Sequence, residues 1–141
     1  MNKYFFLLTI LTIHLLSIEL VVIGDKKFPE NNLTRSEIKA IFLDKKRFIK
    51  REKILVMNHK SEISLRLCFE KNILRKTKRS IERYWRKAYY QGKRPPKIVS
   101  SINMLFLYLD SIHPAIGYSS LTDTINRDIN ILYRVNCESD F

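Results

Sequence analysis

The segment from Ser80 to Ser101, SIERYWRKAYYQGKRPPKIVSS, combines aromatic rings with positive charges. Exposed aromatic side chains beside Lys and Arg form the stacking platforms on which many proteins bind single-stranded nucleic acid. The same composition also arises where an amphipathic helix buries its rings and leaves its charges in solvent. The two interpretations predict different functions, and the spacing of the rings distinguishes them.

The aromatic residues of this segment follow helical spacing. Apolar residues recur at i, i+3, i+4, i+7 and i+8 and therefore share one helix face: Ile81, Tyr84, Trp85, Ala88 and Tyr89. The charged residues fall mostly on the other face, and Tyr90 is the aromatic residue clearly off the stripe. We therefore expect the rings to pack inward, Gly92 to end the helix, and the cations to form a solvated surface.

The chain carries a formal net charge of +12, which indicates attraction to anions in general. The charge is densest from Lys71 to Lys97, where 11 cations stand against the single acid Glu82. Such density is typical of surfaces that bind anionic polymers or membranes. Net charge alone does not distinguish these partners from a small anion such as phosphate.

Cysteine and histidine chemistry is limited by number and spacing. Cys68 and Cys137 form either one disulfide or two buried thiols. Cys68 lies on the apolar side of an expected helix, which favours a buried thiol that acts as a small hydrophobic residue. His14, His59 and His113 are scattered, and no Cys/His pair has zinc-ligand spacing. We expect no metal and no cofactor.

The first 18 residues have the features of a signal peptide. Lys3 supplies a positive charge, and the run from Tyr4 to Leu16 is almost entirely apolar. This run is shorter than the roughly 20 residues of a membrane span and suits the core of a signal peptide. The cleavage pattern is weak, so an uncleaved anchor or a buried N-terminal element remains open. We expect residues 1–18 to direct export and 19–141 to form a periplasmic domain.

The remaining chain alternates strands with helices. Apolar runs predict strands at Leu20–Gly24, Lys53–Met57 and Ala115–Tyr118, and strict alternation predicts a final strand with one face formed by Ile129, Ile131, Tyr133 and Val135. Capping signals predict helices that begin at Thr34 (with a capping box to Glu37), Ser61, Thr77 or Ser80, and Ser100 or Ser101. This order predicts one domain, a three-layer α/β/α sandwich with a mixed sheet.

Short motifs within these elements resemble the phosphate-binding substrate-binding proteins of ABC transporters, especially their short single-domain relatives. The motifs are LTRSEIKAIFLDKKRF, KILVMNHKSEISLRLCFEKNIL, PPKIVSS and AIGYSS. Each is weak alone, but their order and spacing together are specific and cover about Leu20 to Ser120. The resemblance implies one lobe of the type 2 periplasmic-binding fold.

The resemblance also implies an anion site. Where the family has a Ser-Gly-Thr-like run at a helix N-terminus, this chain reads NHKSEIS, and the implied contacts are Asn58, Lys60, Ser61, Ser64 and Arg66. The serine hydroxyls would donate hydrogen bonds beside amides at the positive end of a helix. Glu62 would repel an anion unless it points away or caps the helix, and Ser61 has the alternative role of a simple helix cap.

The expected function is an exported, non-catalytic domain that binds phosphate or another small anion weakly, or that serves as an interaction module. Its expected partners are an ABC transporter permease or a sensor protein, and a membrane only if residues 1–18 are retained. Family members close two lobes on the ligand, whereas this chain has room for little more than one, so affinity should be modest. The alternative function is binding of nucleic acid or a membrane surface through Lys71–Lys97. Spacing supplies no nucleophile–base or carboxylate pair, so we expect no enzyme.

Overall fold

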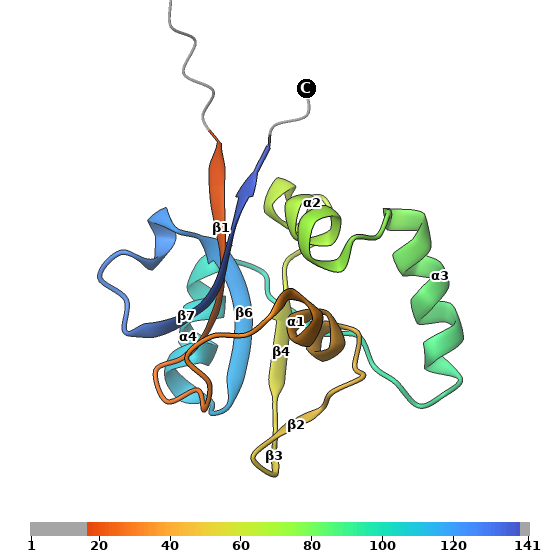
Figure 1. The fold of residues 1–141 in the computed structure, drawn as a ribbon, viewed down its shortest axis with the longest axis horizontal. Coiled ribbons are helices and arrows are strands. Elements are labelled where there is room, and N and C mark those ends of the chain that lie inside the picture. Colours follow the sequence, from red (N-terminus) through yellow and green to blue (C-terminus); the bar gives the residue numbers. More distant parts are fainter. Residues whose placement is uncertain (1–16, 139–141) are drawn as a thin grey trace, which may run out of the picture.

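The computed structural model describes residues 17–138, so residues 1–16 of the expected signal segment lie outside the described residues. A five-stranded mixed sheet with strand order β5-β4-β6-β1-β7 forms the centre (Figure 1). β1 runs antiparallel to β6 and β7, and β4 runs parallel to β5 and β6. The strands are β1 (Ile18–Asp25), β4 (Leu55–Asn58), β5 (Lys97–Ile98), β6 (Ala115–Ser120) and β7 (Ile129–Cys137), with β2 (Phe48–Ile49) and β3 (Glu52–Lys53) in a separate hairpin.

Helices cover both faces of the sheet. They are α1 (Arg35–Phe42), α2 (Ser64–Phe69) with the π-helical turn η1 (Glu70–Leu74), α3 (Lys78–Tyr89), α4 (Ile102–Ser111) and the 3-10 turn η2 (Thr122–Thr124). The first three and η1 share one hydrophobic core with the sheet, and α4 packs on the other face. α3 lies at the margin of the molecule (Figure 1). This arrangement confirms the expected α/β/α sandwich.

β1 is an interior strand between β6 and β7, and apolar side chains occupy both of its faces. Leu20 and Val22 join the core beneath α1 and α2, while Val21 and Ile23 join the core beneath α4. All four side chains are fully buried. A continuous apolar run of this kind is typical of a strand covered on both faces, and the expected strand at Leu20–Gly24 is confirmed.

β7 contains a β-bulge that the alternating sequence pattern does not reveal. Val22 pairs with Tyr133 and Ile23 with Ile131, so Leu132 is the extra residue. A bulge shifts the alternation by one residue. Ile131 therefore packs on the α4 side, whereas Leu132 and Tyr133 pack on the α1 side. The final strand is confirmed, but the prediction of one shared face was wrong.

Helix starts follow the capping signals with one exception. Thr34 and Glu37 form the expected capping box, and Thr77 and Ser101 each accept a hydrogen bond from the backbone three residues on. Ser61 does not cap α2, whose N-cap is Ile63 without a side-chain hydrogen bond. The Ser61 hydroxyl instead donates to the Glu62 carboxylate at 3.2 Å, so the predicted cap was wrong.

Cys68 and Cys137 form a disulfide, with Cα atoms 5.6 Å apart. The preference for two buried thiols was wrong, because burial and bonding occur together here: Cys68 is 9% exposed and is also cross-linked. Sequence could not place the two residues side by side, since their proximity depends on the end of β7 passing alongside α2. The bond closes a chain separation of 69 residues.

The apolar stripe of α3 is shorter than its periodicity predicts. Ile81 and Ala88 are buried, but Tyr89 is 60% exposed and Tyr90 is 89% exposed. The Arg94 guanidinium lies 4.7 Å from the centre of the Tyr89 ring. In the last turn of the helix Ala88 packs inward, whereas Tyr89 lies on the solvent side of the same turn. The inward prediction for Tyr89 was wrong, and Gly92 ends the helix region with φ of +79°, as expected.

Candidate anion-binding site

The candidate loop (residues 58–66) lies where three strands end. β4 ends at Asn58, β5 leads into Ser100, and β6 ends at Ser120. Because β4 is parallel to both β5 and β6, these ends meet at one edge of the sheet. Open α/β sheets bind ligands in the crevice at the carboxyl ends of their strands. The loop therefore occupies the edge at which such folds bind ligands.

Buried hydrogen bonds fix the beginning of the loop. The Asn58 side-chain oxygen accepts from the His59 amide at 2.8 Å and from the Tyr118 hydroxyl. His59 Nε2 lies 2.7 Å from the Tyr118 backbone oxygen, and because a carbonyl only accepts, Nε2 must carry the hydrogen. Both Asn58 and His59 are buried. Asn58 is thus committed to the structure of the loop.

Tyr118 links this network to the aromatic core. Its ring stacks on Phe69 with centroids 4.1 Å apart, and Phe42 packs against Phe69 at 4.6 Å. Burial raises the pKa of the Tyr118 hydroxyl, which therefore stays a neutral donor to Asn58. Burial also lowers the pKa of His59, so its ring is neutral near pH 7 and adds no positive charge to the loop.

Arg66 braces the loop from inside. Its guanidinium donates to the His59 backbone oxygen at 2.7 Å and to the Glu70 carboxylate at 3.2 Å. The two side chains are only 17% and 8% exposed. A half-buried cation with a carboxylate partner has less charge to offer a ligand, so Arg66 acts mainly as a positioning residue.

The exposed rim of the loop consists of Lys60, Ser61, Glu62 and Ser64. Ser64 is the first residue of α2, where opening amides generally lack an intrahelical acceptor, although the Arg66 amide already donates to the Ile63 backbone oxygen at 3.0 Å. The pKa of Glu62 is lowered by a hydrogen bond from its own backbone amide and by the Ser61 hydroxyl, so this carboxylate is ionised near pH 7. The structure brings all five predicted contacts into one loop, but only Lys60, Ser61 and Ser64 face solvent.

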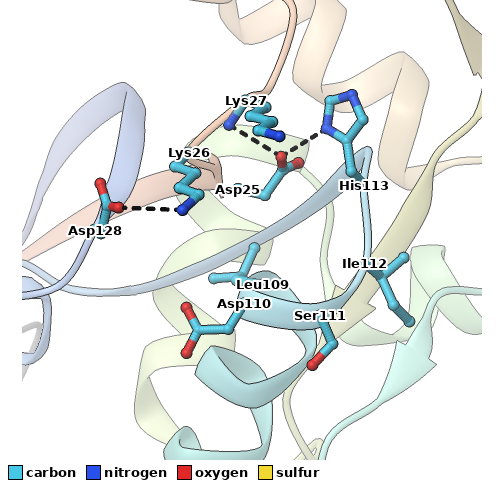
Figure 2. Close-up of a pocket in the computed structure, with 9 residues that line it drawn as sticks. All are labelled: Asp25, Lys26, Lys27, Leu109, Asp110, Ser111, Ile112, His113 and Asp128. Atoms are coloured by element: carbon cyan, nitrogen blue, oxygen red, sulfur yellow. Dashed lines mark hydrogen bonds and ion pairs between the residues drawn. The ribbon is translucent and has the colours of Figure 1, made fainter.

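A second hollow lies at the opposite edge of the sheet, where β1 ends and β6 begins (Figure 2). It has a volume of about 390 Å³. Buried Asp25 borders it and accepts from the amides of Lys27 at 3.1 Å and Ala115 at 2.9 Å. Asp25 also lies 2.6 Å from His113 Nδ1, and Figure 2 shows the imidazole above the carboxylate.

Within residues 17–138, the Asp25–His113 pair is not arranged as part of a hydrolytic triad. His113 Nε2 faces the Glu52 carboxylate at 3.7 Å. A hydrolytic triad requires a hydroxyl or thiol nucleophile in that position. Sequence reasoning missed this pair because 88 residues separate its members. The only local signal was an acid that directly follows a buried strand, which identifies Asp25 but not its partner.

Solved structures of phosphate transport proteins share this fold. They are an ABC-type phosphate transport receptor from Vibrio cholerae (TM-score 0.65, 18% identity), a phosphate ABC transporter substrate-binding protein with bound phosphate from Clostridium perfringens (0.66, 17%) and PstS from Borrelia burgdorferi (0.61, 19%). Each superposition covers 82% of this chain but only 46%, 44% and 47% of the respective neighbour. The chain therefore has the fold of one lobe of a phosphate-binding protein and spans less than half of its neighbours' length.

Sequence comparisons add no family to this structural result: no family model matches the chain, and no curated protein matches it. The three structural neighbours are named for phosphate transport, so they do not favour the nucleic-acid or membrane alternative. Within residues 17–138, no three His, Cys, Asp or Glu side chains are grouped to hold a metal ion. In the same part of the chain, no helix has the length and apolar character needed to cross a bilayer.

Proposed function

We propose that this chain is an exported, non-catalytic domain that binds orthophosphate or a similar small anion weakly at the candidate loop. Lys60 supplies charge, the Ser64 hydroxyl donates a hydrogen bond, the Ser61 hydroxyl donates another once it turns away from Glu62, and the first amides of α2 complete the contact. Asn58 and Arg66 hold the loop in shape from behind. With one lobe, the anion stays partly hydrated, so the dissociation constant lies in the millimolar range, about 4 kcal/mol of binding.

The observation that supports this proposal most directly is the position of the loop at the carboxyl ends of β4 and β6, in a lobe whose structural neighbours include a protein with bound phosphate. Export is supported by the apolar N-terminal run and by the disulfide, since disulfides persist in oxidising compartments such as the periplasm. An ABC transporter permease or a sensor protein is the partner class that fits this placement.

Titration of orthophosphate into the purified domain, followed by NMR amide shifts and calorimetry at constant ionic strength, tests the proposal. We expect shifts concentrated in residues 60–65 and a loss of affinity of about threefold or more in the double variant Lys60→Gln/Ser64→Ala, which removes one charge and one donor. The matched control is Lys50→Gln/Ser36→Ala, which makes the same two changes at exposed positions elsewhere.

Two outcomes would contradict the proposal. One is the absence of any shift or heat at about 10 mM orthophosphate, well above the expected dissociation constant. The other is an equal loss of affinity in both double variants, which would indicate general attraction to a basic protein and no site at the loop.

A further inference from the structure

Three lysine ammonium groups surround the ring of Tyr84. The Nζ atoms of Lys76, Lys45 and Lys93 lie 5.6, 5.9 and 6.0 Å from the ring centre. The three lysines come from different segments: the turn after α1, the link between η1 and α3, and the turn after α3. Convergence of three separate segments on one ring is a property of the fold and does not follow from a run of basic sequence.

Tyr84 is held in place at the centre of this group. Its hydroxyl donates to the Leu43 backbone oxygen at 2.5 Å, and its ring packs edge-on against Trp85 at 5.0 Å. Burial, and secondarily the charge of Asp44, raises the pKa of Tyr84, so the ring carries no negative charge to balance the lysines. Cation–π attraction holds ammonium groups near a ring but leaves their charges in place.

Further cations border the same surface. Lys39 of α1 is half-buried, and its pKa is lowered first by burial and then by the charges of Lys76, Arg35, Lys45 and Arg75. The four lysines that gather here, Lys39, Lys45, Lys76 and Lys93, are named the Tyr84 cluster. Mutual repulsion within this cluster is unfavourable for the folded chain, so a ligand that neutralises it gains binding free energy.

Nearby acids do not neutralise the Tyr84 cluster. Asp44 pairs with Arg47 at 3.0 Å and accepts from the Arg94 amide at 2.9 Å. Glu37 is held in the capping box with Thr34. In the part of the chain from residue 17 to 138, no lysine of the cluster forms an ion pair. Within the described residues the cluster is therefore a concentration of positive charge whose lysines have no ion-pair partner, and the nearby Asp44 is already paired with Arg47.

We propose that the Tyr84 cluster is a second anion site, which takes a compact multivalent phosphate of the pyrophosphate or tripolyphosphate class. A short phosphate chain carries several charges within a few ångströms and can contact Lys45, Lys76 and Lys93 together. A flat membrane is a poorer match, because Lys76 and Lys93 are half-buried and point toward one ring. None of these residues belongs to the candidate loop, so this site is independent of the proposed orthophosphate site.

Calorimetric titration with sodium tripolyphosphate at constant ionic strength tests the site. We expect the triple variant Lys45→Gln/Lys76→Gln/Lys93→Gln to bind about tenfold or more weakly, since three charge contacts that are individually modest are lost together. The control Lys50→Gln/Arg51→Gln/Lys53→Gln removes an equal number of positive charges from the β2–β3 hairpin. It should bind tripolyphosphate as tightly as the unaltered chain does. Orthophosphate shifts in residues 60–65 should be unchanged in both variants.

The proposal would be overturned if the cluster variant bound tripolyphosphate as tightly as the unaltered chain does. It would also be overturned if the hairpin control lost as much affinity as the cluster variant. Binding of anionic lipid vesicles or single-stranded DNA through the same three lysines, without tripolyphosphate binding, would also overturn it, because the surface would then recognise an extended polyanion. If the triple variant fails to fold by circular dichroism, NMR of the unaltered chain decides the question. Tripolyphosphate must then change the amide chemical shifts of residues 45, 76, 84 and 93. Unchanged shifts at these four residues would exclude the site.

Discussion

His59 Nε2 lies 2.7 Å from the backbone oxygen of Tyr118, and this hydrogen bond ties the end of β4 to the end of β6. The two rings also meet edge-on, with centroids 4.8 Å apart. The bond requires a hydrogen on Nε2 in every charge state of the ring, so protonation changes only Nδ1. The candidate loop is therefore attached to a histidine whose charge is controlled by burial.

The stability of the domain should depend on pH through His59. Burial holds the folded-state pKa of His59 below the ordinary value of 6.5. Below pH 6.5 the unfolded chain therefore binds a proton at His59, whereas the folded chain keeps the ring neutral. Stability contributed by the neutral ring is complete above about pH 6.5 and is lost as pH falls toward the depressed pKa. Urea unfolding of the unaltered chain and His59→Gln across pH 5–8 measures this effect.

We expect the free energy of unfolding of the unaltered chain to exceed that of His59→Gln most at pH 7–8, with the difference shrinking toward pH 5. The glutamine amide keeps a donor for the Tyr118 backbone oxygen but does not titrate. The variant therefore separates the effect of protonation from the effect of losing the hydrogen bond. A difference that is constant over this range, or that grows as the pH falls, would contradict the assigned pKa direction.

Reduction of the Cys68–Cys137 disulfide should destabilise the domain substantially. Opening a cross-link between residues 69 apart in sequence increases the entropy of the unfolded chain by an amount worth about 4 kcal/mol at 25 °C in the chain-entropy description. Thermal and urea unfolding with and without dithiothreitol measure the change. The double variant Cys68→Ala/Cys137→Ala is the control and should not respond to the reductant. Two free thiols in the untreated chain would show that the bond is absent.

Local sequence signals predicted most of the fold. Apolar runs gave the strands around Leu20 and Ala115, and capping residues such as Thr34 and Ser101 gave the helix starts. These features depend on neighbours within a few residues, so one sequence contains them. The bulge at Leu132 and the exposure of Tyr89 depend on how distant elements pack, and neither has a local signal.

The resemblance placed the candidate site in one loop, and anion binding at that loop stays a prediction. The resemblance identified the loop after β4, and the sheet order confirms that this loop stands at the carboxyl ends of the strands. It did not reveal that Asn58 and Arg66 face inward, because their partners Tyr118 and Glu70 are selected by the tertiary structure. Side-chain chemistry alone could not separate the exposed residues of the loop from the residues that hold it in shape.

Gly24 should be intolerant of a side chain. A Cβ atom at this position would lie 2.6 Å from Cγ and 2.8 Å from Cβ of Phe28, which is buried and fixed by the turn after β1. We expect Gly24→Ala to cost about 1–3 kcal/mol, as overpacking of a dense core does. In the matched control, Gly117→Ala, the one close contact of the new Cβ is the terminal Cδ1 of Leu105 at 2.6 Å, and its next contacts, Leu105 Cγ and Met57 Cβ, are ordinary at 3.7 Å. Urea unfolding should rank Gly24→Ala as the more damaging, and the reverse order would contradict this assignment.

Glu62 should limit anion binding at the candidate loop. Its carboxylate is exposed, is ionised near pH 7 and stands between Ser61 and Ser64, two of the proposed contacts. Replacing it by Gln removes an exposed like charge beside the anion, so orthophosphate should bind roughly two- to fivefold more tightly. Glu82→Gln on exposed α3 adds the same net charge away from the loop and should leave affinity unchanged. NMR titration at fixed ionic strength compares them. Unchanged affinity in Glu62→Gln would remove the loop as the binding site, and tightening in both variants would assign the effect to net charge.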